Sequence, residues 1–179
     1  MIEFFETIEK RESCRDFDIN QPVEHEKLVA CIEAARIAPS ACNSQPWYYQ
    51  VANNPEVCKK LRPALQGMQM NNFVETCPAF IVVSETYAGL MATVGGKAKK
   101  QHYALVDIGL AVSQLCLGAT AQGLSTCILG WFNEDKIREL CQLPKTQRIR
   151  LVICVGYARK DLIRKKSRKA WEDIAVFLD

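Results

Sequence analysis

The stretch that decides the fold is HYALVDIGLAVSQLCLGATAQG, residues 102–123. Residues 108–121 contain no charged side chain, so apolar residues cover almost every face of the predicted helix. Small residues, among them Gly109 and Gly118, allow a neighbouring backbone to approach closely, and Gly123 suits the helix end. The uncharged part has the length of a core helix, and Asp107 argues against a membrane span. We therefore predict a buried helix at the centre of a soluble fold.

The composition is that of a single globular domain covering residues 1–179, with 49% hydrophobic and 24% charged residues. The first residues carry acids where a secretory signal would carry bases and a long apolar run, which predicts a cytoplasmic protein. Nine dispersed cysteines without a CxxC pair favour reduced, buried thiols over disulfides or a zinc site. Because His25 and His102 are the only histidines, we predict no metal site and no Ser-His triad.

Positive charge is concentrated near the C-terminus. Residues 159–169, RKDLIRKKSRK, hold seven bases and one acid, whereas the whole chain carries a net charge of +3. Three interpretations are open: a solvated charged run, a nucleic-acid contact, or a clamp for a phosphate. The nucleic-acid interpretation lacks the interleaved aromatic residues that stack on bases.

A second group of bases lies in KRESCRDF, residues 10–17. Arg11, Ser13 and Arg15 alternate, so in an extended segment their side chains point the same way. Two guanidinium groups on one patch favour a bidentate anion such as phosphate. The alternative is a pair of surface salt bridges to nearby acids.

A polar loop follows in IAPSACNSQPWYYQVA, residues 37–52. Pro39 and Pro46 bracket Ser40, Asn43 and Gln45 and lead into an expected strand at residues 47–52. A loop held in this way suits the presentation of amide and hydroxyl groups to a ligand. Taken alone, the same residues equally fit a capped turn.

The remaining pattern alternates helices with apolar strands. Besides the central helix we expect helices at residues 2–10, 22–36, 55–66 and 134–141, and strands at residues 47–52, 79–84, 125–132 and 149–158. Residues 79–84 read as a central strand, residues 86–100 as a mobile Gly- and Lys-rich loop, and residues 170–178 as a short amphipathic segment. This order predicts an α/β or α+β fold whose sheet is covered by helices. No GxGxxG motif or P-loop is present in the sequence.

Four stretches in this order, KRESCRDF, APSACNSQPW, the central helix with GLSTCILGWF, and ICVGYA followed by KKSRK, resemble the FMN-dependent nitroreductase family and its short members in particular. The resemblance implies an α+β three-layer sandwich with a central, mostly antiparallel sheet wrapped by helices. It also implies an intertwined homodimer with FMN in two grooves at the subunit interface. An interface would explain why the central helix is apolar on nearly all faces.

The resemblance also implies the residues that bind the cofactor. The segment around Arg11 and the tail pair Lys166 and Arg168 would reach the FMN phosphate, and the proline-bracketed loop would come from the partner subunit. Leu129 and Gly130 would lie beside flavin N5 and O4, where better-known members carry a Glu-Gly pair, so Leu129 takes the Glu place. The implied set is Arg11, Glu12, Ser13, Arg15, Pro39, Ser40, Asn43, Gln45, Asn71 at the flavin ring, Leu129, Gly130, Lys166 and Arg168.

The implied function is that of an oxidoreductase. FMN takes a hydride from NAD(P)H at N5 and passes it to a nitroaromatic, quinone or similar small acceptor by a ping-pong mechanism. No side chain is assigned as catalytic; Ser40 and Tyr103 are candidates for an acid or base but suit structural roles. The short segment 86–100 favours a small, open pocket, and no nucleic-acid or membrane partner is expected.

Several alternatives stay open at this stage. The same fold serves ene reduction, dehalogenation and flavin destruction, so the fold does not decide the acceptor. The chain could also be a flavin-binding module without turnover, or a nucleic-acid binder that uses residues 159–169. A dimer without flavin, in which Arg11 and Arg15 pair with acids, is the last alternative.

Overall fold

The computed structural model describes residues 4–67, 70–160 and 163–178. Its helices and strands are α1 (Phe4–Lys10), α2 (His25–Arg36), β1 (Trp47–Ala52), α3 (Pro55–Leu65), β2 (Ala79–Glu85), α4 (Leu90–Lys99), α5 (Tyr103–Ala121), β3 (Ser125–Leu129), α6 (Glu134–Leu140) and β4 (Arg148–Gly156). Short 3-10 turns lie at η1 (Ala41–Asn43), η2 (Asn72–Thr76) and η3 (Trp171–Asp173). The expected helix start at residue 2 lies outside the described residues.

The four strands form one sheet in the order β1-β2-β4-β3, and all three pairings are antiparallel. β2 lies inside the sheet and is buried along nearly its whole length, as predicted for a central strand. Its side chains alternate between two cores. Phe80 and Val82 lie in one core, and Ile81 and Val83 lie in the other. The predicted antiparallel sheet is therefore confirmed.

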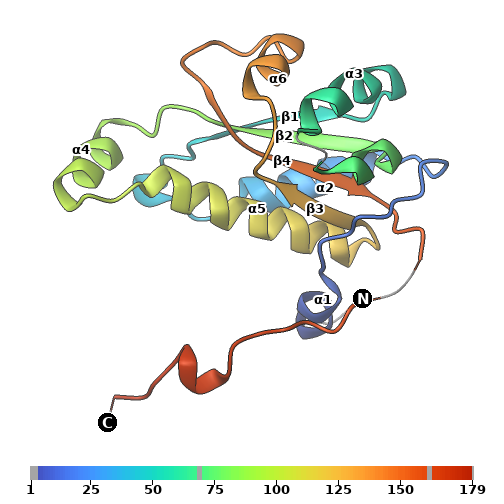
Figure 1. Cartoon of the computed structure of the whole chain (residues 1–179). Coiled ribbons are helices and arrows are strands. Elements are labelled where there is room, and N and C mark those ends of the chain that lie inside the picture. Colours follow the sequence, from blue (N-terminus) through green and yellow to red (C-terminus); the bar gives the residue numbers. More distant parts are fainter. Residues whose placement is uncertain (1–3, 68–69, 161–162, 179) are drawn as a thin grey trace.

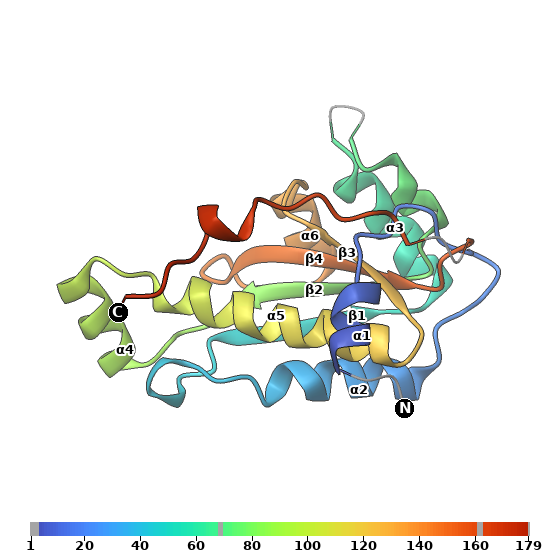
Figure 2. The same cartoon turned by 90° about the horizontal axis from the view of Figure 1, so that it is seen from below.

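Helices cover both faces of this sheet, so the molecule has three layers (Figures 1 and 2). One core holds side chains of α2 and α5 packed on Ile81 and Ile153, and the other holds side chains of α3 and α6 packed on Phe80 and Val152. The predicted three-layer α+β architecture is confirmed. That the chain is a single domain stays a prediction.

The central helix α5 is nearly the predicted one and ends as expected. Gly123 adopts a left-handed φ of 78°, and the amide of Leu124 donates to the carbonyl of Ala119 at 2.9 Å, which is a Schellman ending. A Cβ on Gly118 would lie 2.9 Å from the Cβ of Ala34, so this glycine permits the close packing of α5 on α2. Gly109 has no such neighbour within 4 Å.

Several expected boundaries are wrong. β3 ends at Leu129 instead of residue 132, and β4 ends at Gly156 instead of residue 158. α2 begins at His25 rather than residue 22, because Glu24 has extended backbone and its carboxylate accepts the Tyr157 hydroxyl hydrogen bond at 2.7 Å. Val29 is exposed, since the buried stripe of α2 runs through Leu28, Cys31 and Ala35.

The expected mobile loop at residues 86–100 contains the helix α4. Its first turn is fixed by the Thr93 hydroxyl, which donates to the carbonyl of Gly89 at 2.7 Å. Its last turn contains Gly96, which is buried and lies against the ring of Tyr103. Glycine and lysine content suggested a loop here, but local hydrogen bonds and packing on α5 favour a helix.

Large apolar side chains stay exposed on several elements, and those of α1, α5 and the tail bear on the site. They are Phe4, Phe5 and Ile8 on α1, Leu105, Val106 and Leu110 on α5, and Trp171, Ile174, Val176, Phe177 and Leu178 in the tail. The tail leaves the body of the molecule altogether (Figure 1), and within it the rings of Trp171 and Phe177 lie 5.6 Å apart. By length and composition alone α5 is also apolar enough to cross a membrane, although α2 and the sheet pack against it here. So much exposed apolar surface indicates an interface.

Candidate functional site

The segment that carries Arg11, Ser13 and Arg15 runs along the edge of the sheet. Ser13 forms a parallel bridge with Thr126 of β3, and the amide of Cys14 donates to the Thr126 carbonyl at 2.9 Å. Cys14 is buried in the core while Arg15 is exposed, as the alternation of an extended segment requires. The sheet edge thus holds this basic segment in place.

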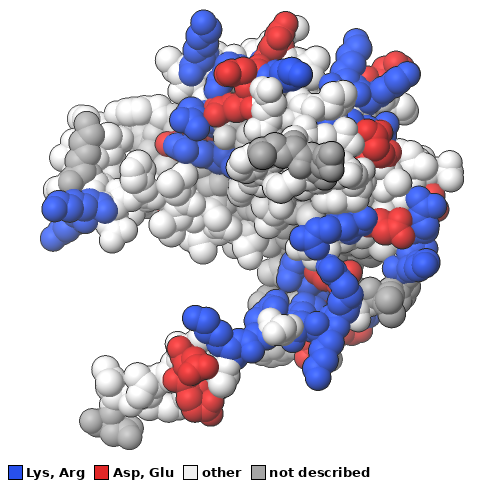
Figure 3. Space-filling model, in the orientation of Figure 1, with Lys and Arg blue, Asp and Glu red and all other residues white. Residues whose placement is uncertain are grey.

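A groove of about 550 Å³ lies between α1, α5 and the edge of the sheet. It brings together Arg11, Lys166 and Arg168, which the sequence places at opposite ends of the chain. Figure 3 shows lysine and arginine side chains gathered where the tail crosses α1. The lining residues are Ile8, Arg11, Gly109, Val112, Ser113, Cys116, Leu117, Ile128, Leu151, Lys166 and Arg168.

Arg11, Arg15 and Arg168 have no acidic partner among the residues that the structure describes. Within residues 4–67, 70–160 and 163–178, the side chains of Arg11 and Arg15 form no ion pair and donate no hydrogen bond. Arg168 donates only to the neighbouring carbonyl of Ser167 at 2.6 Å, and Lys166 donates to the carbonyl of Glu9. The alternative in which Arg11 and Arg15 pair with acids is therefore not what the described residues adopt.

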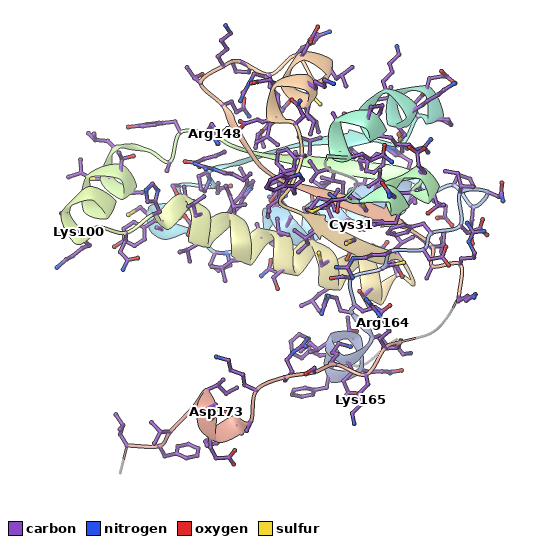
Figure 4. The ribbon with its side chains drawn as sticks, viewed as in Figure 1. Cys31, Lys100, Arg148, Arg164, Lys165 and Asp173 are labelled. Atoms are coloured by element: carbon purple, nitrogen blue, oxygen red, sulfur yellow. The ribbon has the colours of Figure 1, made fainter. Side chains whose placement is uncertain are left out.

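Arg164 was missed by the sequence analysis and fastens the tail to this groove. Its guanidinium donates to the carboxylate of Glu12 at 3.3 Å and to the carbonyl of Ser13 at 2.6 Å. Its amide donates to the same Glu12 carboxylate at 3.1 Å. Figure 4 shows Arg164 and Lys165 beside α1. The sequence offered a signal for this contact: Arg164 lies two residues before Lys166, and the first motif carries an acid, Glu12, that can pair with it.

The proline-bracketed loop adopts a strained conformation. Cys42, Asn43 and Gln45 have φ values of 52°, 51° and 45°, which non-glycine residues rarely adopt. The Ser40 hydroxyl accepts the Gln45 amide hydrogen bond at 3.0 Å, and the Gln45 side chain donates to Asn43 Oδ1 at 3.2 Å. Such strain persists only where surrounding structure holds it, and it clusters at ligand sites.

Asp107 of α5 is what holds this loop. Its carboxylate is 4% exposed and accepts the Ala41 amide hydrogen bond through both oxygens, at 3.2 and 3.1 Å. The Ser44 hydroxyl lies 3.5 Å from the same carboxylate. The one charged residue in the apolar helix thus has a structural partner, and the loop is fastened to the N-terminal half of α5.

The structure does not bring the loop and the basic groove together within one chain. The loop is tied to Asp107, and none of residues 39–45 is among the residues that line the groove, which runs along α5 from Gly109 to Leu117. In Figure 2 the loop before β1 lies beyond one end of α5, and α1 lies at its other end. Two predicted halves of one site therefore stand apart in a single protomer.

Leu129, Gly130 and Asn71 lie where β3 ends. Leu129 is buried and Gly130 is exposed, with open space around the position of an added Cβ. Asn71 has a left-handed φ of 60°, and its side-chain amide donates to the carbonyls of Leu65 and Trp131, both at 3.1 Å. These bonds place Asn71 against the residue that follows Gly130.

All nine cysteines are free, and seven of them are buried. Burial raises the pKa of the Cys31 and Cys127 thiols to about 11, so both stay protonated and unreactive near neutral pH. Burial also raises the pKa of Cys116 in the groove, against smaller opposing effects of the Thr126 hydrogen bond and the Arg11 charge. Among the residues that the structure describes, no group of three metal-ligating side chains occurs.

Known proteins resemble this chain along nearly its whole length. An oxygen-insensitive NADPH nitroreductase of Helicobacter acinonychis is 27% identical over 192 residues, covering 90% of each chain. An iodotyrosine deiodinase 1 of Pongo abelii is 25% identical and covers 98% of this chain and 68% of its own.

Solved structures agree with this picture. A putative nitroreductase in complex with FMN from Exiguobacterium sibiricum superposes with a TM-score of 0.83 at 25% identity, covering 99% and 98% of the two chains. A nitroreductase family protein from Clostridium novyi gives a TM-score of 0.77 at 26% identity, covering 91% and 89%. The sequence profile of the nitroreductase family matches residues 8–72 and 69–157. The predicted resemblance is thereby confirmed: the chain belongs to the nitroreductase family.

Proposed function

We propose that this chain is an FMN-dependent oxidoreductase that takes a hydride from NAD(P)H and reduces a nitroaromatic, a quinone or a similar small acceptor. The observation that carries the proposal is the basic groove beside α5, in which Arg11 has no acidic partner among the described residues. Family membership supports the same cofactor and the same reaction class.

The residues of the groove fit FMN. Arg11, Lys166 and Arg168 offer charge-assisted hydrogen bonds to a phosphate dianion, and Arg15 adds a further cation close by. The other walls are apolar and suit a flat ring, with Val112, Leu117, Ile128 and Leu151 among them. A volume of about 550 Å³ is ordinary for a cofactor or ligand cleft.

Each part of the groove has a role in this proposal. Arg11 and Arg168 bind the phosphate, and Glu12 positions the tail through Arg164. The backbone at Leu129 and Gly130, which follows the groove residue Ile128 in the chain, would contact the reactive edge of the ring, and Ile128 would exclude water from it. When bound, FMN supplies hydride acceptance and donation at N5. The protein supplies orientation and a dry, polarising environment.

We further propose a homodimer in which the loop at residues 39–45 completes the groove of the partner. Its support is that none of residues 39–45 lines the groove of its own chain, and that α1, α5 and the tail expose apolar surface. Ser40, Asn43 and Gln45 then present hydroxyl and amide groups to the ring from the other subunit. Burial of the exposed apolar side chains would stabilise this assembly. The cytoplasmic location stays a prediction.

Reductive dehalogenation is the second candidate, and it rests on the likeness to an iodotyrosine deiodinase. It requires the same flavin site and differs in the acceptor. The comparison to make is turnover of a nitroaromatic against release of iodide from 3-iodotyrosine. Iodide release that exceeds nitro reduction would favour this candidate.

The first test is the visible spectrum of the purified protein before and after anaerobic addition of NADPH or NADH. We expect flavin bands that bleach with a nicotinamide and return with an acceptor. Flavin bands that never bleach would leave a flavin-binding module. A protein that stays colourless after reconstitution with FMN would contradict the proposal.

A further inference from the structure

A second hollow lies between α4 and the start of α5. Its volume is about 560 Å³, which suits a small aromatic molecule. Two tyrosines, Tyr87 and Tyr103, supply ring surface, and Thr93, Lys100 and His102 supply polar groups. The full lining is Glu85, Thr86, Tyr87, Ala88, Ala92, Thr93, Gly96, Lys100, Gln101, His102, Tyr103 and Ala104.

Two charged residues line this hollow, Lys100 and Glu85, and of these only Glu85 has an ionic partner among the described residues. Residues 86–103 contain three lysines and no acid. The two nearest acids in sequence are already engaged, since Glu85 pairs with Arg150 at 2.5 Å and Asp107 accepts the Ala41 amide. Figure 3 shows blue side chains at the free end of α4 and no red ones beside them on that face. Lys100 forms no ion pair with any residue that the structure describes.

The turn that carries Lys100 is tightly built. The Gln101 amide donates to the carbonyl of Gly96 at 2.8 Å, and a Cβ on Gly96 would lie 2.7 Å from the Gln101 carbonyl oxygen. Lys100 itself has a left-handed φ of 54°. The backbone therefore holds Lys100 at the open rim between α4 and α5, as Figure 4 shows.

The hollow also lies next to the proposed cofactor site. α4 contacts η1, which belongs to the loop that we assign to the groove of the partner. In the proposed dimer, α4 of one protomer therefore borders the FMN groove of the other. A molecule that stacks on the ring can extend into the hollow.

We infer that the hollow binds the electron acceptor and selects an aromatic acceptor with an anionic substituent such as a carboxylate. Lys100 binds that anionic group, and Tyr87 and Tyr103 flank the aromatic ring. Lys100 is thus a specificity residue that takes no part in hydride transfer. This inference rests on the proposed function, because it names the acceptor for the same site.

The test compares two acceptors that share a ring and a nitro group, 4-nitrobenzoate and 4-nitrobenzyl alcohol. For the FMN-loaded dimer with NADPH we expect Lys100→Gln to raise KM about tenfold for the benzoate and to leave kcat unchanged. For the alcohol, KM should stay the same. Lys100→Arg should retain the preference for the benzoate. Lys59→Gln, at an exposed position of α3, is the matched control and should change neither KM value.

Direct binding provides a second readout. Calorimetric titration of oxidised holoprotein with 4-nitrobenzoate should show a Kd that Lys100→Gln weakens by the same factor and that salt weakens further. Equal KM changes for both acceptors, or no change for either, would overturn the inference. Failure of the proposed function looks different, because NADPH and NADH would then not bleach the parental flavin at all.

Discussion

The two ends of α5 are built in opposite ways. At the Asp107 end the loop is fixed by its own hydrogen bonds: the buried carboxylate accepts the Ala41 amide, and side chains within the loop close it. At the Cys116 end the guanidinium of Arg11 has no partner among the described residues, and apolar walls stand open around it. One end is preorganised, and the other requires a ligand.

The contrast shows how one helix can serve two cofactor sites. A loop held in a strained conformation costs free energy that the surrounding contacts must offset, and such strain is typical of ligand sites. A basic groove that no acid neutralises is suited to bind an anion. In the proposed dimer, two-fold contact between the two α5 helices would bring the rigid end of one beside the open end of the other. Each prediction below tests one side of this contrast.

Arg11→Ala should have the largest effect. Loss of a charge-assisted contact to phosphate should weaken FMN binding about 100-fold, as measured by quenching of flavin fluorescence. Because the Arg11 side chain forms no ion pair or hydrogen bond with the residues that the structure describes, the urea midpoint of the apoprotein should not move. Arg36→Ala, on the exposed side of α2, is the matched control. A large loss of apoprotein stability in Arg11→Ala would mean that Arg11 is structural.

Asp107→Ala should act on the other end. It leaves the Ala41 amide without its acceptor and should lower the free energy of unfolding by about 2 kcal/mol in urea titrations. FMN affinity should also fall, because the loop at residues 39–45 loses its anchor. Asp135→Ala, an exposed acid on α6, should change stability by less than about 0.5 kcal/mol. Unchanged FMN affinity in Asp107→Ala would separate the loop from the site.

Glu134→Gln should have the smallest effect of the three variants on stability and FMN affinity. Glu134 lies on α6, away from both ends of α5. Burial acts to raise the pKa of Glu134, but the Ile149 amide, Arg148 and Arg138 outweigh it and hold that pKa below its ordinary value of 4.5. A lowered folded-state pKa stabilises the fold above pH 4.5, and this contribution is lost as the pH falls through the folded-state value.

The variant should therefore lower the free energy of unfolding by about 1 kcal/mol at pH 7 and by almost nothing at the lowest pH at which the protein stays folded. Urea titrations at several pH values measure the difference between the two proteins. FMN affinity at pH 7 should be unchanged, since α6 lies on the opposite face of the sheet from α5. A cost that stays constant down to acid pH would contradict the role given to this carboxylate.

The sequence predicted the layers well because burial leaves a strong pattern. The uncharged run that became α5 and the continuous apolar run of β2 admit few other structures. α4 was missed because Gly95 and Gly96 lower helix propensity, whereas the packing on α5 that favours the helix is a tertiary interaction.

The sequence showed that bases from both ends of the chain could gather, but not how the structure arranges them. Arg11 and Arg168 share one groove, as the charge asymmetry suggested, but nothing in the sequence alone shows that Arg164 fastens the tail through Glu12. The separation of the loop from the groove depends on which end of α5 each contacts. This arrangement results from tertiary packing and cannot be derived from the spacing of residues in the sequence.

The most direct test of a shared site is a heterodimer with two different defects. One protomer carries Arg11→Ala and the other carries Ser40→Ala with Asn43→Ala, and each protomer has its own affinity tag. If the loop completes the groove of the partner, one of the two sites contains only native residues. We predict that each homodimer of defective chains binds FMN weakly, and that the purified heterodimer binds one FMN with parental affinity. A heterodimer with no site of parental affinity, although the parental dimer binds two, would contradict the account.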